Sequence, residues 1–267
     1  MSPTVSVTPE QIAFFRREGY LAIGSSLSTP AELAAVRQTY DRLFAERAGW
    51  AEGNAFDLAG TDQGAANLPQ ILGPSRYAPE LRQTLYWANA RHIAALLLGG
   101  DGGDGGDHAI CKPARGGSAT PWHQDEAYWD PGLDYTSLSV WIPLQDATPD
   151  NGCMVFVPGT HTLEVLPHHT LGHDPRIHAL ELDHLEQYAD LLGCAVTCPL
   201  PAGGATFHYS RTFHYTGPNL SDEPRRAHVL GFGRPPQPRH DGRRFPWNEA
   251  KQTARGARRR AFEAHRT

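Results

Sequence analysis

The chain is poor in the features that would place it in a membrane or in an oxidising compartment. No run of about 18 apolar residues occurs, so we expect no membrane-spanning segment. No apolar stretch typical of a signal peptide follows the opening Met-Ser-Pro-Thr-Val, which favours a cytoplasmic protein. Cysteine is scarce and forms no Cys-x-x-Cys pair. We therefore expect reduced thiols, without metal or disulfide, at Cys111, Cys153, Cys194 and Cys198.

Positive charge is scarce as well. The net charge is −5 and the pI is near 6.3, whereas a nucleic-acid partner needs a basic face, so we expect no such partner. The basic run from Arg255 to Arg266 is more typical of a solvated helix face or a frayed terminus than of a binding tail. A chain of 267 residues can bury a large core without disulfides, and we expect a single domain over residues 1–267. The sequence does not indicate an oligomeric state.

The N-terminal part, about residues 1–100, is predicted to be helical. Thr8-Pro-x-Gln11 and Thr29-Pro-x-Glu32 each combine a capping hydroxyl, a proline and an N3 partner, which is typical of a helix start. Gly19 should end the first helix, and Tyr20–Ile23 should form a short strand. The second helix is expected to run from Pro30 towards Ala48, with one buried face made of Leu33, Val36, Tyr40, Leu43 and Phe44.

Three further segments precede the chemistry-bearing part of the chain. Residues 49–76 show little periodicity and are predicted to form a long loop. A third helix is expected from about Pro79 to Leu98, and its predicted buried stripe is Leu81, Leu85, Ala88, His92 and Leu96. Gly99–Asp107 matches one turn of a calcium-binding β-roll, but such sites need stacked repeats, so we interpret it as a flexible connector.

From about residue 105 to residue 235 the pattern changes to short strands and turns, followed by a tail at 236–267. Leu138–Leu144 alternates in polarity, and Asp150-Asn-Gly152 is typical of a turn. This pattern predicts a mainly β fold with flanking helices: a double-stranded β-helix, or jelly roll, with the N-terminal helices packed on one sheet. The space between the two sheets of such a fold is where a site is expected.

The stretch Thr120–Trp129 carries the first candidate chemistry. On a strand, side chains two residues apart share a face, so His123 and Asp125 should point the same way. Together they are two thirds of a 2-His-1-carboxylate site, which suits non-haem Fe(II). His184-x-Glu186 has the same spacing, but Leu180–Leu192 has helical periodicity, so those two side chains should diverge.

A second constellation lies in Phe213–Phe232. It is predicted to be a strand, a turn rich in Gly, Pro, Asn and Ser, and a second strand. Such a hairpin would bring His214 and Arg225 onto neighbouring strands. The residues alone leave the third metal ligand open between His208 and His214, because six residues of extended chain put both side chains on the same face.

Taken together, these motifs resemble the phytanoyl-CoA dioxygenase family of Fe(II)/2-oxoglutarate oxygenases. The similar features span about residues 8–235, nearly the whole chain. They are His123-x-Asp125, His214 followed by Gly-Pro-Asn-x-Ser, Arg225 eleven residues after that histidine, the run Leu138–His161, and the opening Thr8–Tyr20.

The resemblance implies that His123, Asp125 and His214 bind Fe(II), with His208 as the remaining alternative for the third ligand. It implies an oxidoreductase that uses O2 and 2-oxoglutarate to hydroxylate a small molecule, releases succinate and CO2, and is assisted by ascorbate in vitro. The family pattern places 2-oxoglutarate against Arg225, Thr216, Trp141 and His108, and strand alternation would turn the adjacent Arg226 away.

Several alternatives stay open at this point. Related halogenases carry a small residue in place of Asp125, so its carboxylate favours oxidation at a C–H bond over halogenation. The outcome could instead be desaturation, cyclisation or epoxidation, and a non-catalytic metal- or ligand-binding jelly roll is the alternative class. Candidate substrate contacts, besides residues 49–76, are Tyr128, Trp129 and Arg115. We expect His92 to be a packing residue, and we expect four turn or loop histidines to be solvated rather than metal ligands: His161, His168, His169 and His173.

Overall fold

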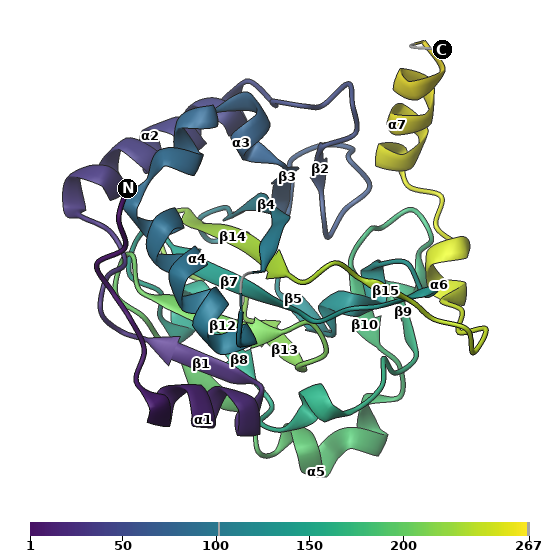
Figure 1. The fold of residues 1–267 in the computed structure, drawn as a ribbon. Helices are drawn as coiled ribbons and strands as arrows, with labels where there is room; N and C mark the ends of the chain where they lie inside the picture. The colour runs from purple at the N-terminus through teal and green to yellow at the C-terminus, as the bar shows by residue number, and fades with distance from the viewer. Residues whose placement is uncertain (101, 266–267) are drawn as a thin grey trace.

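The structure is a computed structural model that describes residues 1–100 and 102–265, and its core is two antiparallel sheets packed face to face (Figure 1). The predicted jelly roll with flanking helices is therefore confirmed. The larger sheet has the strand order β1 (Tyr20–Ile23), β12 (Ala205–Tyr209), β7 (Ser137–Pro143), β14 (Arg225–Gly233), β4 (Gly103–Lys112), β3 (Pro69–Leu72) and β2 (Ala55–Asp57). The smaller sheet has the order β11 (Val196–Cys198), β8 (Met154–Phe156), β13 (His214–Thr216) and β5 (Thr120–His123).

Two short strand pairs lie outside the main sheets. β10 (Leu180–Leu182) pairs with β9 (His168–Thr170), and β15 (Gln237–Pro238) pairs with β6 (Leu133–Asp134). The first of these pairs corrects the helix prediction for Leu180–Leu192, which is helical only from residue 185 onwards, in η6 (Leu185–Tyr188) and α5 (Ala189–Leu192). His184 adopts a left-handed conformation and does approach Glu186, with 3.5 Å between Nδ1 and Oε1, so the expected divergence was wrong.

The predicted helix starts are found where the capping motifs place them. α1 (Pro9–Glu18) has the Thr8–Gln11 capping box and ends at Gly19, which is in the left-handed region with φ 82°. α2 (Pro30–Ala45) is capped by Thr29, but the Glu32 carboxylate accepts a hydrogen bond from the backbone N–H of Leu85 at 2.6 Å instead of closing a box. Glu32 thereby joins α2 to the start of α4 (Leu85–Leu98), which packs on β14 and β7 (Figure 1).

Strand alternation divides the large sheet into two faces. The outward face packs against α1, α2 and α4 and includes Val140, Ile142 and Leu230. The inward face includes Trp141 and Val229, which pack with Met154 and Phe156 of the small sheet. Residues that can reach the space between the sheets are therefore the odd-numbered ones on β7 and β14.

Several local predictions were wrong. Residues 49–76 contain β2 and β3, because three-residue and four-residue strands leave almost no periodic signal. The third helix is split at Thr84 into η1 (Pro79–Gln83) and α4, so the buried face of α4 shifts to Tyr86, Trp87, Asn89, Ala90, Ile93, Ala94, Leu97 and Leu98. Most of the predicted connector Gly99–Asp107 is strand β4, although Asp101 lies outside the described residues.

The predicted hairpin between His214 and Arg225 was also wrong. β13 belongs to the small sheet and β14 to the large one, so residues 217–224 cross from one sheet to the other. The crossing is tightly held: the Lys112 Nζ donates to the Gly217 carbonyl at 2.7 Å, and a Cβ at Gly152 would meet the same oxygen at 2.4 Å. The turn composition was recognised correctly, but composition does not determine which strand becomes the partner.

The predicted C-terminal tail folds back over the jelly roll. Within 236–265 it contains α6 (Pro246–Glu249) and α7 (Ala254–Ala264). The Trp247 indole N–H and the Asn248 side-chain amide both donate to the Ala127 carbonyl, at 2.9 and 2.7 Å. Most of the basic run forms α7, while Arg266 is outside the described residues. No helix in the described part of the chain has the length and apolar character needed to cross a membrane.

Candidate metal centre

His123, Asp125 and His214 converge on one point between the sheets. β5 and β13 are neighbours, and their register pairs His123 directly with His214. The Nε2 atoms of the two histidines lie 3.5 and 3.4 Å from the Asp125 Oδ1. The three ligand atoms all lie within 4.8 Å of one another, which is the spread that a single ion can bridge.

The aspartate reaches this point by a different local geometry from the one expected. β5 ends at His123, and Asp125 is the first residue of the 3-10 turn η2 (Asp125–Tyr128). Strand alternation predicted the shared direction of the two side chains, but a turn at the strand end produces it.

Both histidines are oriented by backbone carbonyls. The Nδ1 of His123 lies 2.7 Å from the Pro121 oxygen, and the Nδ1 of His214 lies 2.9 Å from the Thr212 oxygen. Because only a protonated Nδ1 can donate to a carbonyl, each ring presents the Nε2 lone pair to the centre. Burial, followed by the charge of His214, lowers the pKa of His123, which favours the neutral form that binds metal.

The Asp125 carboxylate divides its two oxygens between two tasks. Its Oδ2 accepts a hydrogen bond from the Ser139 hydroxyl at 2.7 Å and lies 3.3 Å from the Nε2 of His208. Its Oδ1 faces the two histidines. Burial raises the pKa of Asp125, but the lowering effects of His214 and then of His123 and His208 outweigh it. The pKa of Asp125 therefore lies well below its usual range. The group is therefore a carboxylate at neutral pH.

His208 occupies the position of an outer partner of the centre. It projects from β12, is 2% exposed, and its Nε2 contacts the Asp125 oxygen that faces away from the other two histidines. The group of potential ligands found in the described residues consists of His123, Asp125 and His214. This geometry favours His214 over His208 as the third ligand.

Arg225 lies deep between the sheets without a partner for its charge. It is 1% exposed, and its Nε and Nη1 have no hydrogen-bond partner in the described structure. Its guanidinium carbon lies 5.3 Å from the centre of the Trp141 ring. Burial lowers the pKa of Arg225 to about 10, which leaves it charged at neutral pH. A buried, unpaired guanidinium is costly, so the site fits a ligand that supplies a carboxylate.

The structure separates the other residues that were considered with Arg225. Arg226 points to the outer face, where its Nε donates to Asp41 at 2.6 Å. Thr216 is buried, and its hydroxyl donates to the Thr120 hydroxyl at 3.0 Å. Lys112 was missed from the sequence: it is fully buried opposite Arg225, and it donates to the carbonyls of residues 118 and 217. Only the register of β4 with β14 could have indicated it.

His108 and Tyr128 lie near the centre, whereas the other two candidate contacts lie apart from it. Burial lowers the pKa of His108 to about 4, against the raising effect of the nearby Asp125. The Tyr128 ring meets the His123 ring edge-on, with 5.8 Å between centroids. Trp129 packs on Tyr135 instead. Arg115 is 74% exposed on a turn and forms an ion pair with Asp222.

Among the turn and loop histidines, His168 was wrongly expected to be solvated. It is 4% exposed and its Nε2 accepts a hydrogen bond from the backbone N–H of Gln124 at 3.2 Å. This bond holds Gln124, which lies between His123 and Asp125 in the sequence. His161 packs on Tyr209, and His169 lies between Glu181 and Asp183.

The comparisons with known proteins agree with this geometry. Residues 15–227 match the family model described as phytanoyl-CoA dioxygenase. The probable alpha-ketoglutarate-dependent hypophosphite dioxygenase of Stutzerimonas stutzeri is 32% identical over 122 residues, which cover 45% of this chain and 41% of that protein. The ectoine dioxygenase of Bordetella bronchiseptica is 24% identical over 82% of this chain and 73% of that one. The chain thus spans about two fifths of the first of these curated relatives.

Two solved structures extend the likeness to nearly the whole chain. EvdO2 from Micromonospora carbonacea var. aurantiaca, complexed with 2-oxoglutarate, is 37% identical with a TM-score of 0.78, over 92% of this chain and 99% of that one. The non-heme alpha ketoglutarate dependent carbocyclase SnoK from nogalamycin biosynthesis is 25% identical with a TM-score of 0.71, over 91% of this chain and 92% of that one.

Proposed function

Since the chain belongs to the phytanoyl-CoA dioxygenase family, we propose that it is an Fe(II)- and 2-oxoglutarate-dependent dioxygenase acting on a small-molecule substrate. One observation carries this proposal: a cluster of two histidines and one aspartate shares the layer between the two sheets with a buried guanidinium that has no partner. A structural metal site is closed by protein ligands and needs no such cation. A 2-oxoglutarate oxygenase therefore requires both the metal ligands and the guanidinium, whereas a protein that only binds a metal does not require the guanidinium.

The donor set fits Fe(II). Two neutral imidazoles and one carboxylate leave three positions of an octahedral ion open for other molecules. Bound there, Fe(II) supplies the redox chemistry through which O2 and 2-oxoglutarate oxidise a C–H bond, with succinate and CO2 as co-products. The residues that would hold it are His123, Asp125 and His214, with Oδ1 as the aspartate donor because Ser139 and His208 occupy Oδ2.

Arg225 would bind the distal carboxylate of 2-oxoglutarate. A planar guanidinium can donate two parallel hydrogen bonds to one carboxylate. The Nε and Nη1 of Arg225 have no partner in the described structure, so the guanidinium is available for this. Trp141 would form a wall against the co-substrate, because its ring lies next to the guanidinium. Thr216 would add a hydroxyl to the same carboxylate, and His108, which burial keeps neutral at physiological pH, would contact the co-substrate.

The oxidation that we propose is hydroxylation. The Asp125 carboxylate occupies the place that a halide would need, and its pKa keeps it ionised. Desaturation, cyclisation or epoxidation remains the second candidate outcome, because SnoK, a structure with the same fold, is a carbocyclase. These outcomes share the centre and differ in how the substrate is placed.

We also propose a cytoplasmic location, a small molecule as the substrate, and neither a nucleic-acid nor a membrane partner. The four cysteines are free in the structure, which supports a reducing compartment. The net charge of −5 supports the absence of a nucleic-acid partner.

Two measurements test the proposed function. The purified chain with Fe(II) should form a visible charge-transfer band when 2-oxoglutarate is added without O2. With O2 and ascorbate it should then release succinate, slowly alone and faster with a true substrate. A chain that binds Fe(II) but shows neither the band nor succinate with any candidate would be a non-catalytic metal-binding protein.

A further inference from the structure

We propose that the C-terminal segment carries the site that recognises an oxyanion of the substrate, a carboxylate or a phosphate, through Lys251 and Arg255 on either side of His178. The inference rests on the proposed function only in assigning the bound anion to the substrate. The cationic site itself follows from the contacts of these residues.

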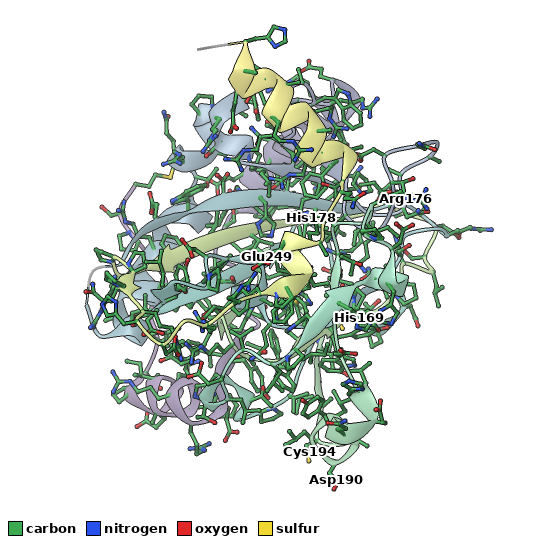
Figure 2. All side chains as sticks on the ribbon, turned by 90° about the vertical axis from the view of Figure 1, so that its right-hand side faces the viewer. His169, Arg176, His178, Asp190, Cys194 and Glu249 are labelled. Carbon is green, nitrogen blue, oxygen red and sulfur yellow. The ribbon has the colours of Figure 1, made fainter. Side chains whose placement is uncertain are left out.

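The two cations sit at the ends of a short stack of rings. The ring of His178 stacks on Tyr128, with 5.6 Å between centroids, and meets Phe56 edge-on at 5.0 Å. The Lys251 Nζ lies 4.7 Å from the centre of the Tyr128 ring, and the Arg255 guanidinium carbon lies 4.8 Å from that of Phe56. Figure 2 shows His178 next to the yellow C-terminal segment from which both cations come.

Within the described residues, the only acid whose charge acts on Arg255 is Asp62, and it does so without a direct ion pair. Neither Lys251 nor Arg255 forms an ion pair there, and the buried Nε of Arg255 has no hydrogen-bond partner. The nearest acids are already used: Asp62 pairs with Arg258 at 2.9 Å, and the Asp57 carboxylate accepts hydrogen bonds from three backbone N–H groups. Two partly buried cations held close together without a directly paired counter-charge are what an anionic group stabilises.

The electrostatics of the three side chains agree with this geometry. Burial, followed by the charge of Arg255, lowers the pKa of Lys251 to about 7, so that in the free protein the amine is fully charged only below neutral pH. Burial and then the two cations lower the pKa of His178 well below its usual range, which leaves the ring neutral and able to donate one hydrogen bond. His178 makes no hydrogen bond with its ring in the part of the chain that the structure describes, so that donor is free for the same anion.

The position of the stack relates it to the metal centre. Tyr128 contacts both the His123 ring and the His178 ring, so Lys251 lies one ring beyond a candidate metal ligand and Arg255 lies three rings beyond it. The segment is fixed on both sides of Lys251: Trp247 is anchored to Ala127, and the Gln252 N–H donates to the Pro175 carbonyl at 2.7 Å. A molecule whose anionic end binds Lys251 would therefore have Tyr128 between that end and the centre.

The same contacts disfavour a macromolecular partner. Lys251 and Arg255 lie over Tyr128 and Phe56, whereas the outward side of α7 presents Arg259, which is 60% exposed and pairs with Glu263. Both cations also lie beyond residues 15–227, the part that matches the family model. The cations of this recognition site thus lie outside the part of the chain that the family model describes.

The test is an anion titration of the metal-free protein, because that measurement does not depend on iron or on turnover. Inorganic phosphate is followed by ³¹P NMR and acetate by ¹³C NMR, in wild type and in the Lys251→Gln/Arg255→Gln double variant. The matched control is Arg244→Gln, in the same segment, where an exposed arginine pairs with Glu249. Arg255→Lys keeps the positive charge. It therefore distinguishes an effect of losing the charge from an effect of misfolding.

We expect saturable binding of at least one of the two anions by wild type and by the Arg244→Gln control. The double variant should bind it at least about tenfold more weakly, since two charge-assisted hydrogen bonds are removed, and Arg255→Lys should retain most of the affinity. Equal affinity in wild type and double variant, or no saturable binding of either anion by wild type, would overturn the proposal.

A second arm separates this proposal from the proposed function. Mn(II) is added to the same samples, and the relaxation of the phosphate or acetate nucleus is measured. Enhanced relaxation in wild type, absent in the His214→Ala variant, places the anion near the metal centre. If the chain binds the anion but not Mn(II), the oxygenase proposal fails while the anion site stands. If it binds Mn(II) and, loaded with Fe(II) instead, releases succinate, but the double variant binds anions as wild type does, only the anion site fails.

Discussion

Replacing Arg225 with methionine should change stability and co-substrate binding in opposite directions. In the free protein Arg225 is 1% exposed with two unsatisfied donors, so its removal in favour of an apolar side chain of similar length should stabilise the fold. Replacing a buried charge in this way is neutral or stabilising by about 1–4 kcal/mol even when the charge is paired. The same substitution removes two charge-assisted hydrogen bonds to 2-oxoglutarate, each worth about 1.5–3 kcal/mol, and should weaken its binding by roughly a hundredfold or more.

The assay is urea unfolding of wild type, Arg225→Met and Arg226→Met, each with and without 2-oxoglutarate, in the presence of Mn(II) and without O2. A ligand at about 100 times its Kd stabilises wild type by about 2.7 kcal/mol, whereas Arg225→Met should show almost no response to the same concentration. Arg226→Met is the matched control, because Arg226 lies on the outer face and pairs with Asp41. A full response in Arg225→Met, or a lost response in Arg226→Met, would refute this assignment of the co-substrate site.

Three further predictions concern the metal centre. Alanine at His123, Asp125 or His214 should abolish tight Mn(II) binding, measured by electron paramagnetic resonance, while circular dichroism stays native; any one variant that binds as wild type does is not a ligand position. Ser139→Ala frees the Asp125 Oδ2 and should lower metal affinity by about 10–100-fold, as loss of an outer hydrogen bond typically does, whereas an unchanged affinity would mean that His208 alone orients the carboxylate. Treating the metal-loaded protein with a chelator should lower its melting temperature, because the ion binds only the native cluster; a constant melting temperature would show that the cluster holds no ion in solution.

The sequence was sufficient for the part of the site that is local in the chain. His123 and Asp125 are two residues apart, so a single short-range argument brings their side chains together, even though a turn rather than a strand produces the approach. Arg225 and Arg226 could likewise be separated by strand alternation, and the structure puts them on opposite faces of β14. Such arguments need only the two-residue repeat of side-chain direction along a strand.

The parts that failed depend on contacts across the fold. The turn between His214 and Arg225 was recognised, but its composition is the same whether the next strand returns to the same sheet or crosses to the other. Lys112 faces Arg225 only through the register of β4 with β14. The position of Lys251 over Tyr128 depends on where the C-terminal segment folds back, which no periodicity in residues 236–265 encodes.

The crossing of residues 217–224 should make the site selective for the length of the co-substrate. His123 and His214 belong to the small sheet and Arg225 to the large one. The hydrogen bond from Lys112 to the Gly217 carbonyl fixes the distance between the two sheets where the chain crosses between them. A dicarboxylic acid can touch both only if its chain matches that gap. Oxaloacetate, one carbon shorter, and 2-oxoadipate, one carbon longer, should therefore be poor replacements for 2-oxoglutarate, however well their 2-oxo ends chelate iron.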